Sequence, residues 1–104
     1  MKKTVKDMVD EAMAEVETIS VAEAMKRQDD DAFVIVDIRD VRELDREGMI
    51  PGAFHAPRGM LEFWVDPESP YHKDIFASGK TFVFYCRSVQ RSALATKTVW
   101  DMGL

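Results

Sequence analysis

The spacing of hydrophobic positions changes several times along the chain, and each change predicts a different element. Near the N-terminus, apolar residues recur at the spacing of one helical face: Val5, Met8, Val9, Ala12, Met13 and Val16. We expect an amphipathic helix within residues 1–17, with its apolar stripe as a docking face. Two largely apolar runs, residues 33–38 and 81–85, are typical of strands buried on both faces.

Capping signals and turn residues predict further elements between these runs. Ser20–Glu23 and Asp40–Glu43 both have the capping-box pattern, so helices are expected over residues 21–27 and from residue 41 to Gly48. A further helix is expected over residues 93–102. Shorter elements are predicted at residues 17–19 (strand), 54–56 (extended), 60–64 (helix) and 71–76 (helical turn). Strands that alternate with helices predict an α/β fold with a mainly parallel central sheet flanked by helices.

Composition and charge exclude several classes of protein. A chain of 104 residues forms one small domain, and its net charge of −5 argues against nucleic acid as a partner. No apolar run approaches the length of a membrane span. Lys2 and Lys3 resemble the start of a signal peptide, but acidic residues follow them, so no secretory signal is expected.

The use of cysteine and histidine points to a free thiol and away from metal. Cys86 is the only cysteine, which is typical of a protein in the reducing cytoplasm and excludes an internal disulfide. Cys86, His55 and His72 lack the spacing of metal ligands, so neither a metal nor another cofactor is expected.

Cys86 has the most informative setting in the chain. It stands between the strand 81–85 and the next helix, with Arg87 and Arg91 in the same acid-free loop. A thiol at a helix start lies near unpaired backbone N–H groups and the positive end of the helix dipole. Such surroundings bind anions and lower a cysteine pKa from about 8.5 to between about 3.5 and 7.5. The setting favours a reactive thiolate that meets an anionic substrate over an inert core cysteine.

Four segments, in this order, resemble the rhodanese-like domain family. Ile19-Ser20 ahead of a helix resembles its opening element, and Val36-Asp37-Ile38-Arg39 with Glu43 resembles its Asp-x-Arg strand end. Residues 48–57 are similar to its Gly-His-Ile-Pro-Gly-Ala segment, with Met49 in place of histidine. Cys86 to Ser92 resembles the active-site loop Cys-x-x-Gly-x-Arg-Ser, with Val89 at the glycine position. The resemblance defines a predicted rhodanese-like domain at residues 18–104.

The resemblance implies sulfur transfer. The Cys86 thiolate would take the outer sulfur of a small anionic donor such as thiosulfate, become a persulfide, and pass the sulfur to a thiol or cyanide. Arg87 is expected at the donor's charged end, unless it is only solvated, and Arg91 is expected to brace the loop or to touch substrate. The full set of predicted substrate-binding residues is Arg87, Ser88, Val89, Gln90, Arg91 and Arg58, with Asp37, Arg39 and Ser92 as structural support of the site.

Two departures from the family pattern bear on the site and the sheet. Val89 would be strained if its position required a positive φ. Family members usually continue with a strand and a helix beyond the point where this sequence stops, so we expect a C-terminally shortened fold. Three explanations stay open: a naturally short chain, a tail outside the sequence, or completion by a second copy, which makes a homodimer one expectation.

Two other functions remain open beside the sulfurtransferase. Cysteine phosphatases and arsenate reductases use a similar loop, but with five residues between cysteine and arginine. The four residues 87–90 found here form a tighter cradle, which suits a sulfur atom better than a tetrahedral phosphate. The other alternative is a non-catalytic or regulatory rhodanese-like module that binds a partner.

Overall fold

Three parallel strands lie at the centre of the computed structural model, which describes residues 1–104. They are β1 (Phe33–Asp37), β2 (Phe54–His55) and β3 (Thr81–Tyr85), in the order β2-β1-β3. Val36 of β1 stands opposite Phe54 of β2 and Phe84 of β3. β1 is therefore the central strand, and its last four residues are buried, as expected for an apolar run between two neighbours.

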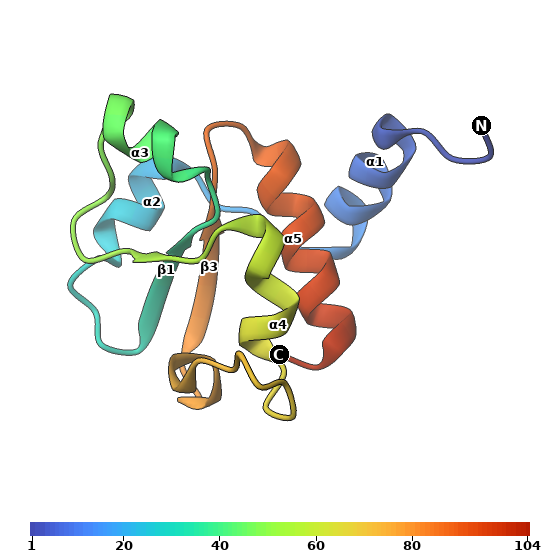
Figure 1. The fold of residues 1–104 in the computed structure, drawn as a ribbon. Helices are drawn as coiled ribbons and strands as arrows, with labels where there is room; N and C mark the ends of the chain where they lie inside the picture. The colour runs from blue at the N-terminus through green and yellow to red at the C-terminus, as the bar shows by residue number, and fades with distance from the viewer.

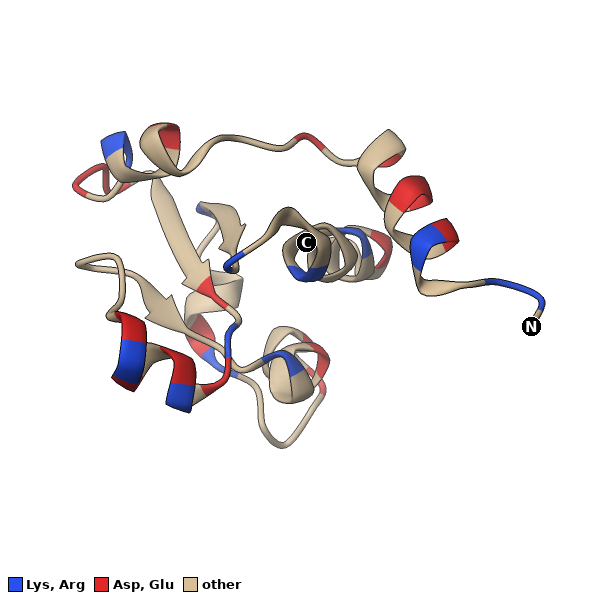
Figure 2. Cartoon of the chain, turned by 90° about the horizontal axis from the view of Figure 1, so that it is seen from above, with Lys and Arg blue, Asp and Glu red and all other residues tan.

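Helices cover both sides of this sheet. They are α1 (Val5–Glu15), α2 (Val21–Lys26), α3 (Val41–Glu47), α4 (Leu61–Val65) and α5 (Val89–Met102), with 3-10 turns η1 (Arg58–Met60) and η2 (Asp74–Ala77). α4 and α5 lie on one side of the strands, α2 lies on the other, and α3 lies beside the carboxyl ends of the strands (Figures 1 and 2). The predicted α/β fold with a parallel central sheet flanked by helices is confirmed.

The caps explain where the shorter helices begin. Asp40 and Glu43 form the predicted capping box, in which each side chain binds the other residue's backbone N–H. Ser20 caps α2 by accepting from the N–H of Glu23, but the Glu23 carboxylate lies 3.9 Å from Arg27 instead of returning to the cap. α2 therefore has only one of the two hydrogen bonds of the predicted capping box, the one from the Glu23 N–H to the Ser20 side chain.

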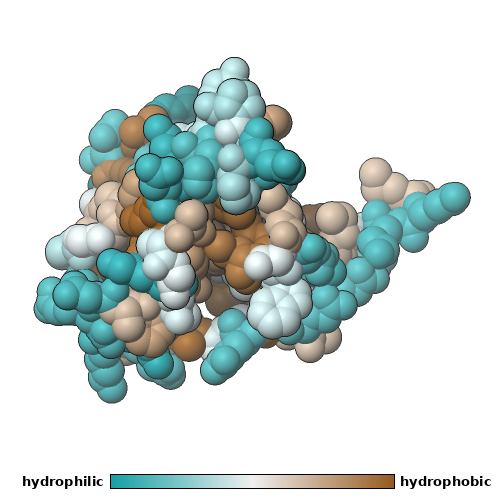
Figure 3. Space-filling view, turned by 90° about the horizontal axis from the view of Figure 1, so that it is seen from below, coloured by the Kyte–Doolittle hydropathy of each residue, from teal (hydrophilic) through white to brown (hydrophobic).

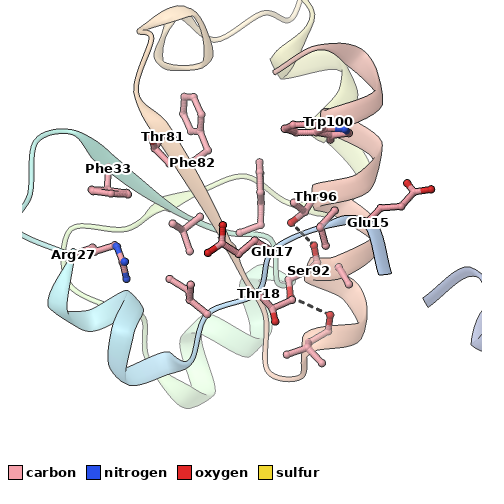
Figure 4. A pocket seen from close by; sticks show the side chains of 16 residues that line it. Glu15, Glu17, Thr18, Arg27, Phe33, Thr81, Phe82, Ser92, Thr96 and Trp100 are labelled. Carbon is pink, nitrogen blue, oxygen red and sulfur yellow. Dashed lines mark hydrogen bonds between the residues drawn. The ribbon is translucent and has the colours of Figure 1, made fainter. Parts of the chain in front are cut away.

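The predicted strand at residues 17–19 is wrong. These residues have no strand partner and make no backbone hydrogen bond with another segment. A cavity of about 430 Å³ separates them from β3, and α5 closes its other side (Figure 4). An extended segment becomes a strand only when its N–H and C=O groups are paired, and here the edge of β3 is too far away to pair them.

The hydrophobic core lies between the sheet and the helices α4 and α5. Its fully or nearly fully buried members include Val36, Ile38, Ala56, Leu61 and Ala95. Seen from below, apolar side chains also gather around a hollow in the middle of the molecular surface (Figure 3). None of the helices combines the length and the apolar character that a membrane span requires.

α1 packs beside α5 on the side away from the sheet (Figures 1 and 2). Ala12 is completely buried in this contact, and Glu15 lies 3.0 Å from Lys97 of α5. Val5, Met8 and Met13 of the same apolar stripe remain exposed. α1 therefore docks on α5 through part of its stripe only.

Candidate active site

Cys86 follows β3 directly and lies beneath the first turn of α5. Its side chain is buried, with 5% of the residue exposed. Sγ donates to the carbonyl oxygen of Ser88 and accepts a hydrogen bond from the Ser92 N–H at 3.2 Å. The sulfur thus contacts an amide at the positively polarised end of a fourteen-residue helix. This is the strand–loop–helix setting that the sequence predicts.

The loop is shorter than predicted because α5 begins at Val89 rather than at residue 93. Ser88 occupies the N-cap position without a side-chain cap bond, and Val89 is the first helical residue. No residue other than glycine has a positive φ. Val89 is therefore unstrained at the position where the family has glycine, because a helical backbone accepts a β-branched residue there.

Both loop arginines point toward α3. Arg87 Nη1 lies 3.0 Å from Glu47 Oε1, and the guanidinium of Arg91 binds both oxygens of Glu43, at 2.7 and 2.9 Å. The hydrogen bond from Arg91 lowers the pKa of Glu43 from 4.5 to about 2. The same hydrogen bond raises the pKa of Arg91, to which the nearby Cys86 also contributes. Arg91 therefore joins the first turn of α5 to α3. Its role as a brace of the loop or as a contact for substrate stays a prediction.

Asp37 and Arg39 form a buried ion pair at the end of β1. Arg39 Nε and Nη2 bind the Asp37 carboxylate at 3.0 and 2.8 Å, and Nη2 also donates to the Gly48 carbonyl at 2.7 Å. The hydrogen bond to Asp37 raises the pKa of Arg39. Glu47 Oε2 accepts from Arg39 Nη1 at 3.2 Å. The pair is thus connected through Glu47 to Arg87 and supports the loop from below.

Glu43 and Glu47 were not predicted as site residues. Glu43 was recognised as a helix cap and as part of the family pattern, and Glu47 was not singled out at all. A signal for both exists in the sequence: they stand four residues apart on one face of α3, the same spacing as Arg87 and Arg91. The two pairs, one from the loop and one from the first turn of α5, are visible only once these segments are placed beside α3.

The side chains of the remaining predicted residues form no hydrogen bond with Cys86 Sγ. Gln90 is exposed and forms no side-chain hydrogen bond, and Val89 lines the cavity beside β3. Arg58 binds Glu62 at 2.6 Å and Thr98 at 3.4 Å. Arg58 also lines, together with Arg91, a second cavity of about 330 Å³ between α1 and α5. The Arg58 guanidinium therefore shares a cavity with Arg91 but forms no hydrogen bond with residues 86–88 of the loop.

No group of three or more His, Cys, Asp or Glu side chains is placed to hold a metal ion. His55 Nε2 lies 2.7 Å from the Arg39 carbonyl oxygen, so this ring is engaged with the backbone at the end of β1. The groups that the structure brings together at the site are Cys86, the amides around it and the two arginine–glutamate pairs.

Comparison with known proteins agrees with this geometry. Residues 20–104 match the family described as "Rhodanese-like domain", and the chain belongs to that family. A solved structure from Rhodopseudomonas palustris CGA009, described as a protein of unknown function and possible tyrosine phosphatase, is 53% identical to this chain, with a TM-score of 0.95. The alignment covers 100% of this chain and 80% of that one. No curated protein matches the chain.

Proposed function

We propose that this protein is a sulfurtransferase that carries sulfane sulfur on Cys86. The Cys86 thiolate attacks the outer sulfur of thiosulfate, the S–S bond of the donor breaks, and sulfite leaves with its electron pair. Cys86 is then a persulfide anion. An acceptor thiolate or cyanide attacks the terminal sulfur, and the thiolate of Cys86 is released with a new persulfide or thiocyanate as product.

The observation that carries the proposal is the hydrogen bond from the Ser92 N–H to Cys86 Sγ at the N-terminus of α5. Amides and the helix dipole stabilise negative charge at this position, first on the attacking sulfur and then on the persulfide. Family membership adds independent support, because the sulfur-carrying loop of rhodanese-like domains is the segment that Cys86 to Ser92 resembles. A lone cysteine that must stay reduced suits a cytoplasmic setting.

A cysteine phosphatase is the second candidate, because the similar structure from Rhodopseudomonas palustris is described as a possible tyrosine phosphatase. A phosphatase needs an arginine for the phosphate and an acid that protonates the leaving oxygen. Arg91 already binds Glu43 through two N–H groups, and the pKa of about 2 keeps Glu43 ionised at neutral pH. Glu43 therefore cannot supply that proton, and the site supports sulfur transfer better.

Intact mass before and after brief treatment with thiosulfate tests the proposal. We expect the wild-type protein to gain one sulfur atom that cyanide or dithiothreitol removes, and Cys86→Ser to gain none. Hydrolysis of an aryl phosphate by the wild type, without any sulfur gain, would establish the phosphatase instead. A folded protein that shows neither activity would be a non-catalytic binding module.

A further inference from the structure

The two glutamates of α3 neutralise the positive charge that the loop offers to a donor. Arg87 pairs with Glu47 and Arg91 with Glu43, while Arg39 pairs with the buried Asp37. Three cations thus face three anions around the loop. Figure 2 shows the alternation of acidic and basic residues along α3, beside the ends of the strands. A doubly charged donor such as thiosulfate meets no excess of positive charge here.

Glu47 is the better anchored member of the pair that it forms with Arg87. Its Oε2 accepts from Arg39, whose side chain is only 4% exposed and is held by Asp37 and by the Gly48 carbonyl. Arg87 extends from the loop with 73% of its side chain exposed, and its Nη1 bonds only to Glu47. A donor anion that binds Arg87 must therefore take this arginine from a fixed carboxylate, and it also approaches that carboxylate's negative charge.

We propose that Glu47 determines which sulfur donor the site accepts. By occupying Arg87, it disfavours thiosulfate and favours low-molecular-weight organic persulfides, whose reacting end carries less charge. The inference rests on the proposed sulfurtransferase function. With such a donor, the Cys86 thiolate attacks the terminal sulfur of R–S–SH, the donor S–S bond breaks, and R–S⁻ leaves while Cys86 becomes Cys86–S–SH. This transfer places no dianion beside Glu47.

Glu47→Gln provides the test, with Asp45→Asn as its matched control. Asp45 lies exposed on the same helix and has no arginine partner, so its variant removes the same charge without freeing Arg87. The measurement is the second-order rate constant for sulfur gain on Cys86, followed by mass, with thiosulfate and with cysteine persulfide. We expect Glu47→Gln to raise the thiosulfate constant by about three- to tenfold, somewhat above the range of one exposed ion pair because a nearby repulsion is also removed. The cysteine persulfide constant should change less than about twofold, as should both constants in Asp45→Asn.

The double variant Glu47→Gln/Arg87→Gln tests the same inference. We expect it to lose the gain in thiosulfate loading that Glu47→Gln produces, because that gain depends on an Arg87 that is free to meet the donor. A gain that persists in the double variant, or no gain in Glu47→Gln, would overturn the role of Glu47 while leaving sulfur transfer intact. Failure of Cys86 to load from either donor in every variant would overturn the sulfurtransferase itself, and this inference with it.

Discussion

The carboxylates Asp37, Glu43 and Glu47 hold the arginines around Cys86, but at very different depths. Asp37 is completely buried with Arg39, whereas Arg87 and Arg91 keep 73% and 41% of their side chains exposed. Removing one partner of a buried pair leaves a charge that nothing compensates. An exposed pair exchanges its partner for water at little cost. We therefore expect the ion pair at Asp37 to contribute to the stability of the fold, and the one at Glu47 to affect mainly the charge around Cys86.

Asp37→Asn should lower the free energy of unfolding substantially. The expected loss is about 3 kcal/mol, the lower end of the range for breaking a buried ion pair, because Arg39 retains Glu47 and the Gly48 carbonyl. Urea unfolding followed by far-UV circular dichroism measures it. Asp45→Asn should stay within about 0.5 kcal/mol of the wild type. Equal stability of the two variants would show that the buried pair contributes nothing.

The Glu43–Arg91 pair predicts a specific pH dependence of stability. The pKa of Glu43 is lowered from 4.5 to about 2 in the folded protein, so its contribution is complete above about pH 4.5. It declines as the pH falls from there to about 2, because over this interval the unfolded state binds a proton that the folded state does not. Unfolding of the wild type and of Glu43→Gln at a series of pH values should show a wild-type advantage that shrinks over this interval. An advantage that is constant down to pH 2 would contradict the prediction.

At the scale of elements, the two ends of α5 have different roles: the first turn contacts Cys86, and the last turn determines where the helix ends. Its first turn places the Ser92 amide on Cys86, and its last turn ends at Gly103, which has a φ of 102°. There the Gly103 N–H donates to the Trp100 carbonyl and the Leu104 N–H donates to the Val99 carbonyl. A left-handed residue of this kind ends a helix by satisfying its last carbonyl groups.

Gly103→Ala tests this end of α5. The left-handed conformation disfavours a Cβ, so we expect a loss of about 1 kcal/mol in the free energy of unfolding. Gly59→Ala is the matched control, since its added Cβ has open space and its φ is not in the left-handed region. That control should be neutral or slightly stabilising. If both variants behaved alike in denaturant unfolding, the conformation of Gly103 would not limit stability.

At the scale of the whole molecule, the open edge of β3 is the least complete part of the structure. β3 pairs with β1 on one side only, and on the other it faces the cavity lined by residues 17–19 and Trp100. Edge strands with unpaired backbone groups are sites where other chains add. Homodimer formation therefore stays a prediction, and sedimentation velocity over a range of concentrations tests it. A single monomeric species throughout would contradict it.

The packing of α1 on α5 gives a second prediction at this scale. Ala12 is completely buried between the two helices, so Ala12→Leu should overpack the contact and weaken the docking of α1 by about 1–3 kcal/mol. Hydrogen exchange of α1 amides should accelerate while the core strands stay protected. Ala14→Leu makes the same change on the exposed side of α1 and should leave the exchange unchanged. Accelerated exchange throughout the chain would mean instead that α1 is part of the global folding unit.

Much of the fold and the identity of Cys86 could be predicted because they depend on neighbours in sequence. Apolar runs, the Asp40 cap and Gly48 at the end of α3 act locally, and all three appear where expected. The strand at residues 17–19 could not be judged in this way, because a strand needs a partner and sequence does not show whether one is within reach. The start of α5 was misplaced for a related reason: the backbone conformation of Val89 and its neighbours is defined only by the folded loop.

The sequence by itself determined that this is an α/β protein of the rhodanese-like kind with one thiol at a helix start. Periodicity, capping and the order of motifs contain that information, because each concerns residues within a few positions of one another. Only the tertiary structure decided what the arginines do. Arg87 meets Glu47 across 40 positions of sequence and Arg91 meets Glu43 across 48, so the charges of both arginines are balanced within the protein itself. Electrostatic balance depends on distances in space, and the fold alone sets those.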